Sequence, residues 1–204
     1  VLTSNEIISE RRIIQAPADN LSLAAANIGK VFVRDATVTG PYASGPSTSV
    51  QQRGGARTPS CVGVGPVSVL TPVGGFRIGD PGALKQRGPD GEWSVLPGDP
   101  GDAIVIMQAP GEIFASISGI TKDYLSRARS VMVFGLANDQ IGYIIPAEQY
   151  DIRSGNAAAL FQPSLEMANY EESLSTGRCT GDQVQNTLLE IGSVLGVMGD
   201  GEGR

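Results

Sequence analysis

The chain has no histidine among its 204 residues. This absence excludes a Ser-His-Asp triad, a Cys-His pair and a histidine-bound zinc ion built from this chain alone. The sequence also has no apolar run near the 18 residues of a membrane-spanning helix. It has no basic cluster, and its net charge is −6. We therefore expect neither a membrane span nor a nucleic-acid partner.

Cysteine is scarce, and the two residues present, Cys61 and Cys179, are far apart. Either they form a disulfide in an oxidising compartment, or both are free thiols. Few lysines and many Gly, Ser, Thr and Pro residues favour a secreted or cell-surface location. The first residues, VLTSNEIISERR, lack the order of a signal peptide and contain no initiator Met, which favours a processed precursor.

The 27 glycines and 13 prolines predict many turns and ordered loops in residues 1–97. We expect strands at ERRIIQA and GKVFVRDATVTG, with a short helix at DNLSLAAANIG between them. Residues 40–66 are predicted to form a long loop. Residues 67–97 are predicted to form hairpins, with one turn at Gly74-Gly75 and another at Asp90-Gly91.

Residues 98–204 have a different pattern. DAIVIMQ is a continuous apolar strand, which predicts burial on both faces. ASISGITKDYLSRARS is a helical pattern, and VMVFGLA is a second apolar strand. Strand, helix and strand with short links predict a right-handed parallel βαβ unit. We therefore expect one structural unit of the α/β class. It would combine a mixed sheet, a parallel βαβ core in the C-terminal half and a β-rich, loop-rich N-terminal half.

Two later segments complete the prediction. IGYIIPAEQYD indicates a short strand followed by a turn or a single helical turn. GDQVQNTLLEIGSVLG is the clearest helix, with Asp182 as its expected cap. Its apolar stripe consists of Val184, Leu188, Ile191 and Leu195.

Polar side chains follow both strands of the predicted βαβ unit. Sites form at the carboxyl ends of parallel strands, so Glu112, Asn138 and Asp139 should lie near one another. Each also has a structural explanation. Glu112 could be a carboxylate at a helix N-terminus, and Asn138-Asp139 could serve a turn. Tyr143 could be a core residue, and Tyr170 a buried tyrosine hydrogen-bonded to the backbone.

Four elements in order carry a family resemblance: PGE after an apolar strand, FGLANDQIGYIIPAEQYD, YEESLST, and the helix GDQVQNTLLEIG. This pattern resembles the C-terminal part of the catalytic domain of neutral (non-lysosomal) ceramidases, over roughly residues 98–195. That family hydrolyses the amide bond of ceramide and looks like a zinc hydrolase. The resemblance implies that Glu112 and Tyr170 are zinc ligands and that Asn138 and Tyr143 are catalytic residues.

The chain departs from the family pattern in three ways. It has no counterpart of the family's zinc histidines or of its upstream serine region, and Gln140 stands where the family usually has an aromatic residue. The first hypothesis is therefore a fragment or subunit of a ceramidase-like amide hydrolase acting on a lipid amide. Histidines from a partner polypeptide would complete its zinc site. The alternative is a secreted, non-catalytic structural or interaction protein. It would self-associate or bind a protein partner through loop 40–66 or an exposed strand edge.

Overall fold

The structure is a computed structural model. It describes residues 7–18, 38–39, 42–43, 64–65, 67–81, 85–87, 93–95, 102–150 and 170–199. The predicted helix at 19–29 and most of the predicted strand at 29–40 lie outside these residues.

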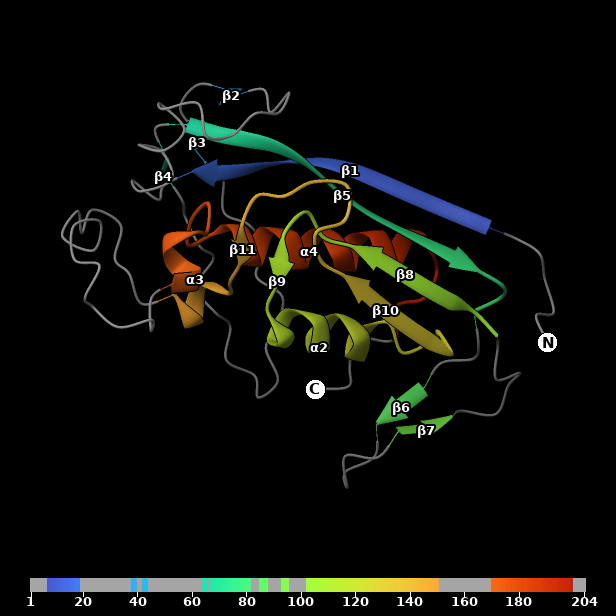
Figure 1. Cartoon of the computed structure of the whole chain (residues 1–204). Helices are drawn as coiled ribbons and strands as arrows, with labels where there is room; N and C mark the ends of the chain where they lie inside the picture. Colours follow the sequence, from blue (N-terminus) through green and yellow to red (C-terminus); the bar gives the residue numbers. More distant parts are fainter. Residues whose placement is uncertain are drawn as a thin grey trace.

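A mixed sheet forms the centre of the structure (Figure 1). Its strands are β1 (Ile7–Ala18), β5 (Val67–Ile78), β8 (Ile104–Gln108) and β10 (Ser130–Phe134), in that order, and β2 (Val38–Thr39) also pairs with β5. The pairs β1–β5 and β5–β8 are antiparallel, whereas β8–β10 is parallel. The α/β class and the mixed sheet are therefore confirmed, and strands from both halves of the chain share this one sheet.

Three short strand pairs stand apart from this sheet. Strands β3 (Tyr42–Ala43) and β4 (Val64–Gly65) pair antiparallel, so the segment predicted as a loop contains paired strands. The predicted second hairpin is present as the antiparallel pair β6 (Lys85–Arg87) and β7 (Trp93–Val95). The turn between them lies outside the described residues. The third pair, β9 (Glu112–Ile113) with β11 (Tyr143–Ile144), is parallel.

Helix α2 (Ala115–Tyr124) connects β8 to β10 and completes the predicted βαβ unit. It ends earlier than its apolar pattern suggests. Leu125 follows the helix as its C-cap, and its backbone N–H donates to the carbonyl of Thr121. Leu125 and Ala128 are nevertheless buried. The segment predicted as one helix therefore continues past the helix end, and Leu125 and Ala128 are buried without being helical.

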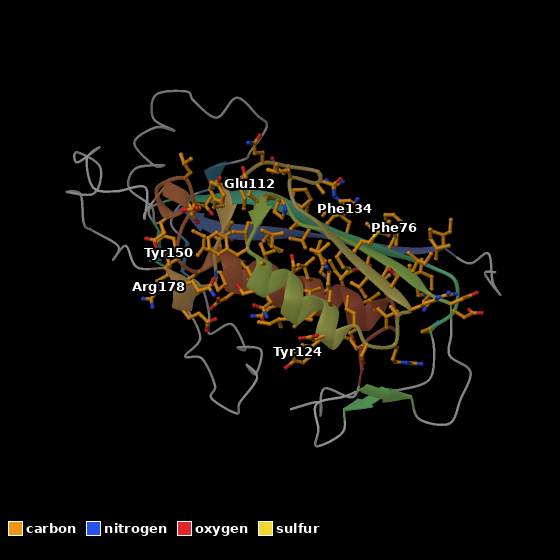
Figure 2. The ribbon with its side chains drawn as sticks, turned by 60° about the horizontal axis from the view of Figure 1, so that its bottom comes forward. Phe76, Glu112, Tyr124, Phe134, Tyr150 and Arg178 are labelled. Atoms are coloured by element: carbon orange, nitrogen blue, oxygen red, sulfur yellow. The ribbon has the colours of Figure 1, made fainter. Side chains whose placement is uncertain are left out.

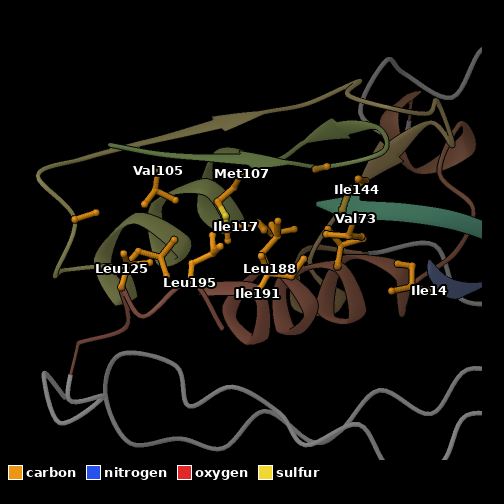
Figure 3. Packing of buried hydrophobic residues seen from close by; sticks show 14 of the residues in the cluster. Ile14, Val73, Val105, Met107, Ile117, Leu125, Ile144, Leu188, Ile191 and Leu195 are labelled. Atoms are coloured by element: carbon orange, nitrogen blue, oxygen red, sulfur yellow. The ribbon is translucent and has the colours of Figure 1, made fainter. Parts of the chain in front are cut away.

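Helix α4 (Thr180–Val194) closes one face of the sheet. Its predicted stripe is confirmed, because Val184, Leu188, Ile191 and Leu195 are fully buried. Figure 3 shows Leu188, Ile191 and Leu195 between the helix and the residues of the sheet and of α2. None of the helices in the described part of the chain is both long and apolar enough to cross a membrane.

The ends of α4 are held by other elements. At its C-terminal end the guanidinium of Arg77, on β5, donates to the carbonyl of Leu195 at 2.6 Å. This contact satisfies one of the carbonyls that a helix leaves without an intrahelical partner. The expectation that Asp182 caps the N-terminus is wrong. Cys179 occupies the N-cap position, and Asp182 instead accepts a hydrogen bond from the backbone of Ala147.

The Gly74-Gly75 pair lies inside β5 and not in a turn, so this prediction is also wrong. A Cβ atom on Gly75 would lie 2.6 Å from Sδ of Met107 and 3.0 Å from Cγ2 of Ile191. A Cβ on Gly74 would lie 3.0 Å from Oε1 of Gln108. The glycines allow side chains of neighbouring strands and of α4 to approach the backbone, which is the other common reason for glycine within a strand.

Only one face of β8 is buried, contrary to the prediction. Val105 and Met107 are fully buried toward the helices, whereas Ile104, Ile106 and Gln108 on the other face are partly exposed. The sequence pattern is that of a strand covered on both sides. The described residues supply a helical layer on one side of the sheet, formed by α2 and α4 (Figure 1).

Two glycine substitutions test this packing. Gly75→Ala should lower the free energy of unfolding by about 1–3 kcal/mol, because the new methyl group overpacks the contact with Met107 and Ile191. Gly119→Ala should raise it by about 0.5–1 kcal/mol, because Gly119 lies within α2 with open space around it and alanine is the better helix former. Urea unfolding of both variants measures the two changes. Equal effects of the same sign would contradict the assigned packing.

Candidate functional site

Two loops meet at the carboxyl ends of β8 and β10, as predicted for a parallel pair. The first covers residues 109–111 and the second residues 135–142. Five backbone hydrogen bonds of 2.8–3.0 Å join them to each other and to the strand ends: Ala109 N to Phe134 O, Leu136 N to Gly111 O, Ala137 N to Ala109 O, Ile141 N to Pro110 O and Glu112 N to Gly142 O. The loops therefore form one platform, which we call the strand-end platform.

Glycines make the close contact between these loops possible. A Cβ atom on Gly111 would collide with the carbonyl of Gly142, and one on Gly135 would lie 2.7 Å from the carbonyl of Gly111. Leu136 and Asn138 have positive φ angles of 53° and 70°. Such a conformation costs a leucine roughly 1–2 kcal/mol. The hydrogen bonds between the loops hold this strained backbone in place, a property common at functional sites.

Glu112 stands on the strand-end platform as the first residue of β9. Its side chain is exposed (Figure 2), and in the parallel β9–β11 pair it lies in register with Tyr143. Helix α2 begins at Ala115 and has no acidic residue in its first turn. The carboxylate of Glu112 is thus presented to solvent from a strand and not from the first turn of a helix.

Asn138 and Asp139 point to different strands of the sheet. Nδ2 of Asn138 donates to Oε1 of Gln108 at 2.9 Å, on the side of the sheet away from the helices. Oδ2 of Asp139 accepts from Oγ1 of Thr71 at 2.8 Å, and its Oδ1 accepts from the backbone of Gln140. The loops that carry Glu112, Asn138 and Asp139 adjoin, as predicted. The hydrogen bonds of Asp139 fit the structural explanation of a turn.

The YEESLST segment also lies beside β11, the strand that pairs with β9. The backbone N–H of Tyr143 donates to the carbonyl of Leu174, and a Cβ on Gly142 would collide with that carbonyl. Tyr170 is the first residue of helix α3 (Tyr170–Ser173), and its side chain lies outside the described residues. Three segments far apart in the sequence, around residues 112, 143 and 174, are therefore neighbours.

Hydrogen bonds of Arg178 and Asp182, at the start of α4, link this region to that helix; we call these contacts the brace. The 3-10 helix η1 (Ala147–Gln149) receives two contacts from the start of α4: Oδ1 of Asp182 accepts from Ala147 N at 3.0 Å, and Nε of Arg178 donates to Ala147 O at 3.2 Å. The hydroxyl of Tyr150 donates to the carbonyl of Glu172. Cys179 in the same region is disulfide-bonded. The chain's other cysteine, Cys61, lies outside the described residues.

The described residues do not form a complete metal site. No group of three or more His, Cys, Asp or Glu side chains gathers among them in a way that could hold a metal ion. The exposed carboxylate of Glu112 could contribute one oxygen ligand. A structural or catalytic zinc site needs at least three protein ligands.

Comparisons with known proteins do not add to this picture. A scan against protein-family models, a search of curated proteins and a search of solved structures each found no match for the chain.

Sequence reasoning missed three residues of this region. Gln108 is the last residue of β8 and orients Asn138. The sequence signal for it was a polar residue at the end of an apolar run. Thr71 is fully buried on β5 and binds Asp139, and Leu174 contributes only a backbone carbonyl. No local pattern marks the last two, because their role depends on which distant segment lies beside them.

The burial of Asp182 in the brace predicts how the free energy of unfolding depends on pH. Burial raises the pKa of Asp182 above its ordinary value of 3.8, while the hydrogen bond from Ala147 and the charge of Arg178 act in the opposite direction. Above pH 3.8 the folded state therefore binds more protons than the unfolded chain, and the free energy of unfolding falls as the pH rises through the folded-state pKa. Asp182→Asn keeps the Oδ1 acceptor but cannot ionise.

Unfolding of the wild type and of Asp182→Asn should be compared between pH 3.5 and pH 7. The variant should match the wild type at the acidic end and become relatively more stable as the pH rises. A wild type that gains stability over the variant with rising pH would show that the carboxylate is stabilised, contrary to this assignment.

Proposed function

We propose that the chain is a fragment or subunit of a ceramidase-like, zinc-dependent hydrolase of a lipid amide, incomplete without histidines from another polypeptide. In this proposal Glu112 and Tyr170 are ligands of the metal, and Asn138 and Tyr143 orient the substrate. The disulfide at Cys179 supports a secreted or cell-surface location, because disulfides persist in oxidising compartments.

The observation that carries the proposal is the convergence of the three motifs of the resemblance. Glu112 of PGE is in register with Tyr143 of the ANDQIGY segment, and Tyr143 is hydrogen-bonded to Leu174 of YEESLST. Glu112 and Leu174 are 62 residues apart in the sequence. Packing of the fold alone does not require that the motifs carrying Glu112, Tyr143 and Leu174 meet at one place.

The strand-end platform suits the role of a positioning surface. Its two loops are fixed by backbone hydrogen bonds, so Glu112 projects from a rigid base. Catalytic and ligand groups work best when their support is rigid. Asn138 is held by Gln108, which leaves its amide oxygen as an acceptor with a defined direction.

A non-catalytic interaction protein is the second candidate. Two observations favour it: the chain contains no histidine, and the described residues contain no cluster that could hold a metal. It predicts a protein partner or self-association and no dependence of any activity on Glu112. The two candidates therefore differ in what a substitution at Glu112 does to a complete assembly.

Glu112→Gln tests the proposed site. In the assembly purified from the natural source, this variant should lose amide hydrolysis of a ceramide substrate by at least about a hundredfold, since the loss of even an outer-shell partner of a metal costs 10–100-fold. Zinc content of the same sample, measured by mass spectrometry, should fall with the activity. The isolated chain should bind no zinc tightly.

The matched control is Glu148→Gln, which removes another exposed glutamate, on η1, without touching the strand-end platform. It should retain activity and zinc. Full activity of the Glu112→Gln assembly, or an equal loss in both variants, would remove Glu112 from the proposed site.

A further inference from the structure

The side of the sheet that faces away from α2 and α4 is apolar and exposed. We call it the open face; it consists of the odd-numbered residues 7–15 of β1 and the even-numbered residues 72–78 of β5, 104–108 of β8 and 130–134 of β10. The strand register places these residues on one side, and most of them are apolar, among them Ile7, Ile13, Phe76, Ile106, Met132 and Phe134. Figure 2 shows Phe76 and Phe134 on the side of the sheet away from α2.

Four of these side chains are exposed, and Phe76 and Ile106 are partly exposed. Ile7 is 67% exposed, Ile13 59%, Phe134 49% and Met132 37%. On a soluble protein, a contiguous apolar patch of this kind marks an interaction surface. The sequence of β8 also indicates an interaction surface, because a continuous apolar run is typical of a strand that is buried on both faces.

The charge of the open face is compatible with binding to the open face of a second copy of this chain. The chain has 21 acidic residues and a net charge of −6, yet the open face carries no acidic side chain. Its one charged residue is Arg11, on the edge strand β1. Two copies stacked about an axis near β8 would therefore bring no carboxylates together and would keep their two Arg11 side chains at opposite margins.

The size of the open face is of the order that a stable dimer needs. The open face spans residues 7–15 of β1, 72–78 of β5, 104–108 of β8 and 130–134 of β10. At about 3.3 Å per residue and about 4.8 Å between strands, its projected area is roughly 400 Å². The accessible area is larger because side chains stand out from the plane, and a standard interface buries about 800 Å² on each partner. Pairing along the β1 edge is less favourable, because the adjacent charges of Glu10, Arg11 and Arg12 oppose strand addition.

We propose that the open face binds the open face of a second copy of this chain, sheet on sheet, as an isologous dimer. Two aligned sheets packed in this way interdigitate their inner side chains to form a second core. Glu112 lies beyond the end of β8, on β9 at the strand-end platform. Asn138, by contrast, borders the open face through its hydrogen bond to Gln108, so the dimer would lie beside one residue of the proposed hydrolase site.

Sedimentation velocity of the full 204-residue chain over a range of micromolar concentrations tests the proposal. The wild type should sediment as a dimer, at twice the 21.2 kDa of one chain. Met132→Lys and Phe134→Lys should each weaken dimerisation about tenfold or more, because each removes a buried apolar side chain and places a charge in the interface. Ile13→Lys, on a different strand, provides a third variant if one of these fails to fold.

The matched control is Val194→Lys on α4, which changes a side chain that is 51% exposed and lies away from the sheet's open face. It should leave the dimer unchanged. A monomeric wild type overturns the proposal, as does a dimer that persists in Met132→Lys and Phe134→Lys. Occupation of the open face by a different, histidine-bearing polypeptide overturns it as well, while leaving the proposed hydrolase intact.

Discussion

The packing of α4 against one side of the sheet is the interaction on which the rest of the structure depends. Its buried stripe belongs to one hydrophobic core with residues from β1, β5, β8 and α2, so elements from both halves of the chain share that core. Each fully buried aliphatic side chain contributes about 1.5–3 kcal/mol. Further contacts fasten the helix: Arg77 binds its C-terminal end, and Arg12 of β1 forms an ion pair with Glu190. With α4 fixed, the segment that precedes it is brought against β11.

This arrangement explains why the candidate site forms where it does. The parallel pair β8–β10 ends at one edge of the sheet, and the two loops that follow fasten to each other through their backbones. The start of α4 places η1 through Asp182 and Arg178, and the 172–174 segment closes against Gly142 and Tyr143. Glu112 is therefore displayed from a rigid edge by contacts that involve three separate stretches of sequence.

Much of this could be predicted from the sequence, where the pattern was long and periodic. The stripe of α4, the strand at β8 and the βαβ unit follow from apolar spacing alone. The predictions failed where a tertiary contact decided the outcome. Gly74-Gly75 suggested a turn but serves close packing in β5, and Asp182 suggested a cap but binds η1. Thr71 carried no local signal, because its partner Asp139 is 68 residues away.

On the open face, the sequence predicted burial, but the described residues do not cover it. Ile104 and Ile106 belong to an apolar run suited to burial on both sides, and they remain partly exposed. The absence of histidine matters in the same way for the proposed hydrolase, which would need metal ligands from another polypeptide. Both proposals therefore place the chain in an assembly.

Composition of the native assembly tests the central claim most directly. Intact-mass analysis and a denaturing gel of material from the natural source should be run beside zinc analysis of the undenatured sample. The proposed hydrolase predicts a second, histidine-containing polypeptide and about one zinc ion for each copy of this chain. An assembly that contains this chain alone, without zinc, would contradict it and leave the non-catalytic interaction protein as the better account.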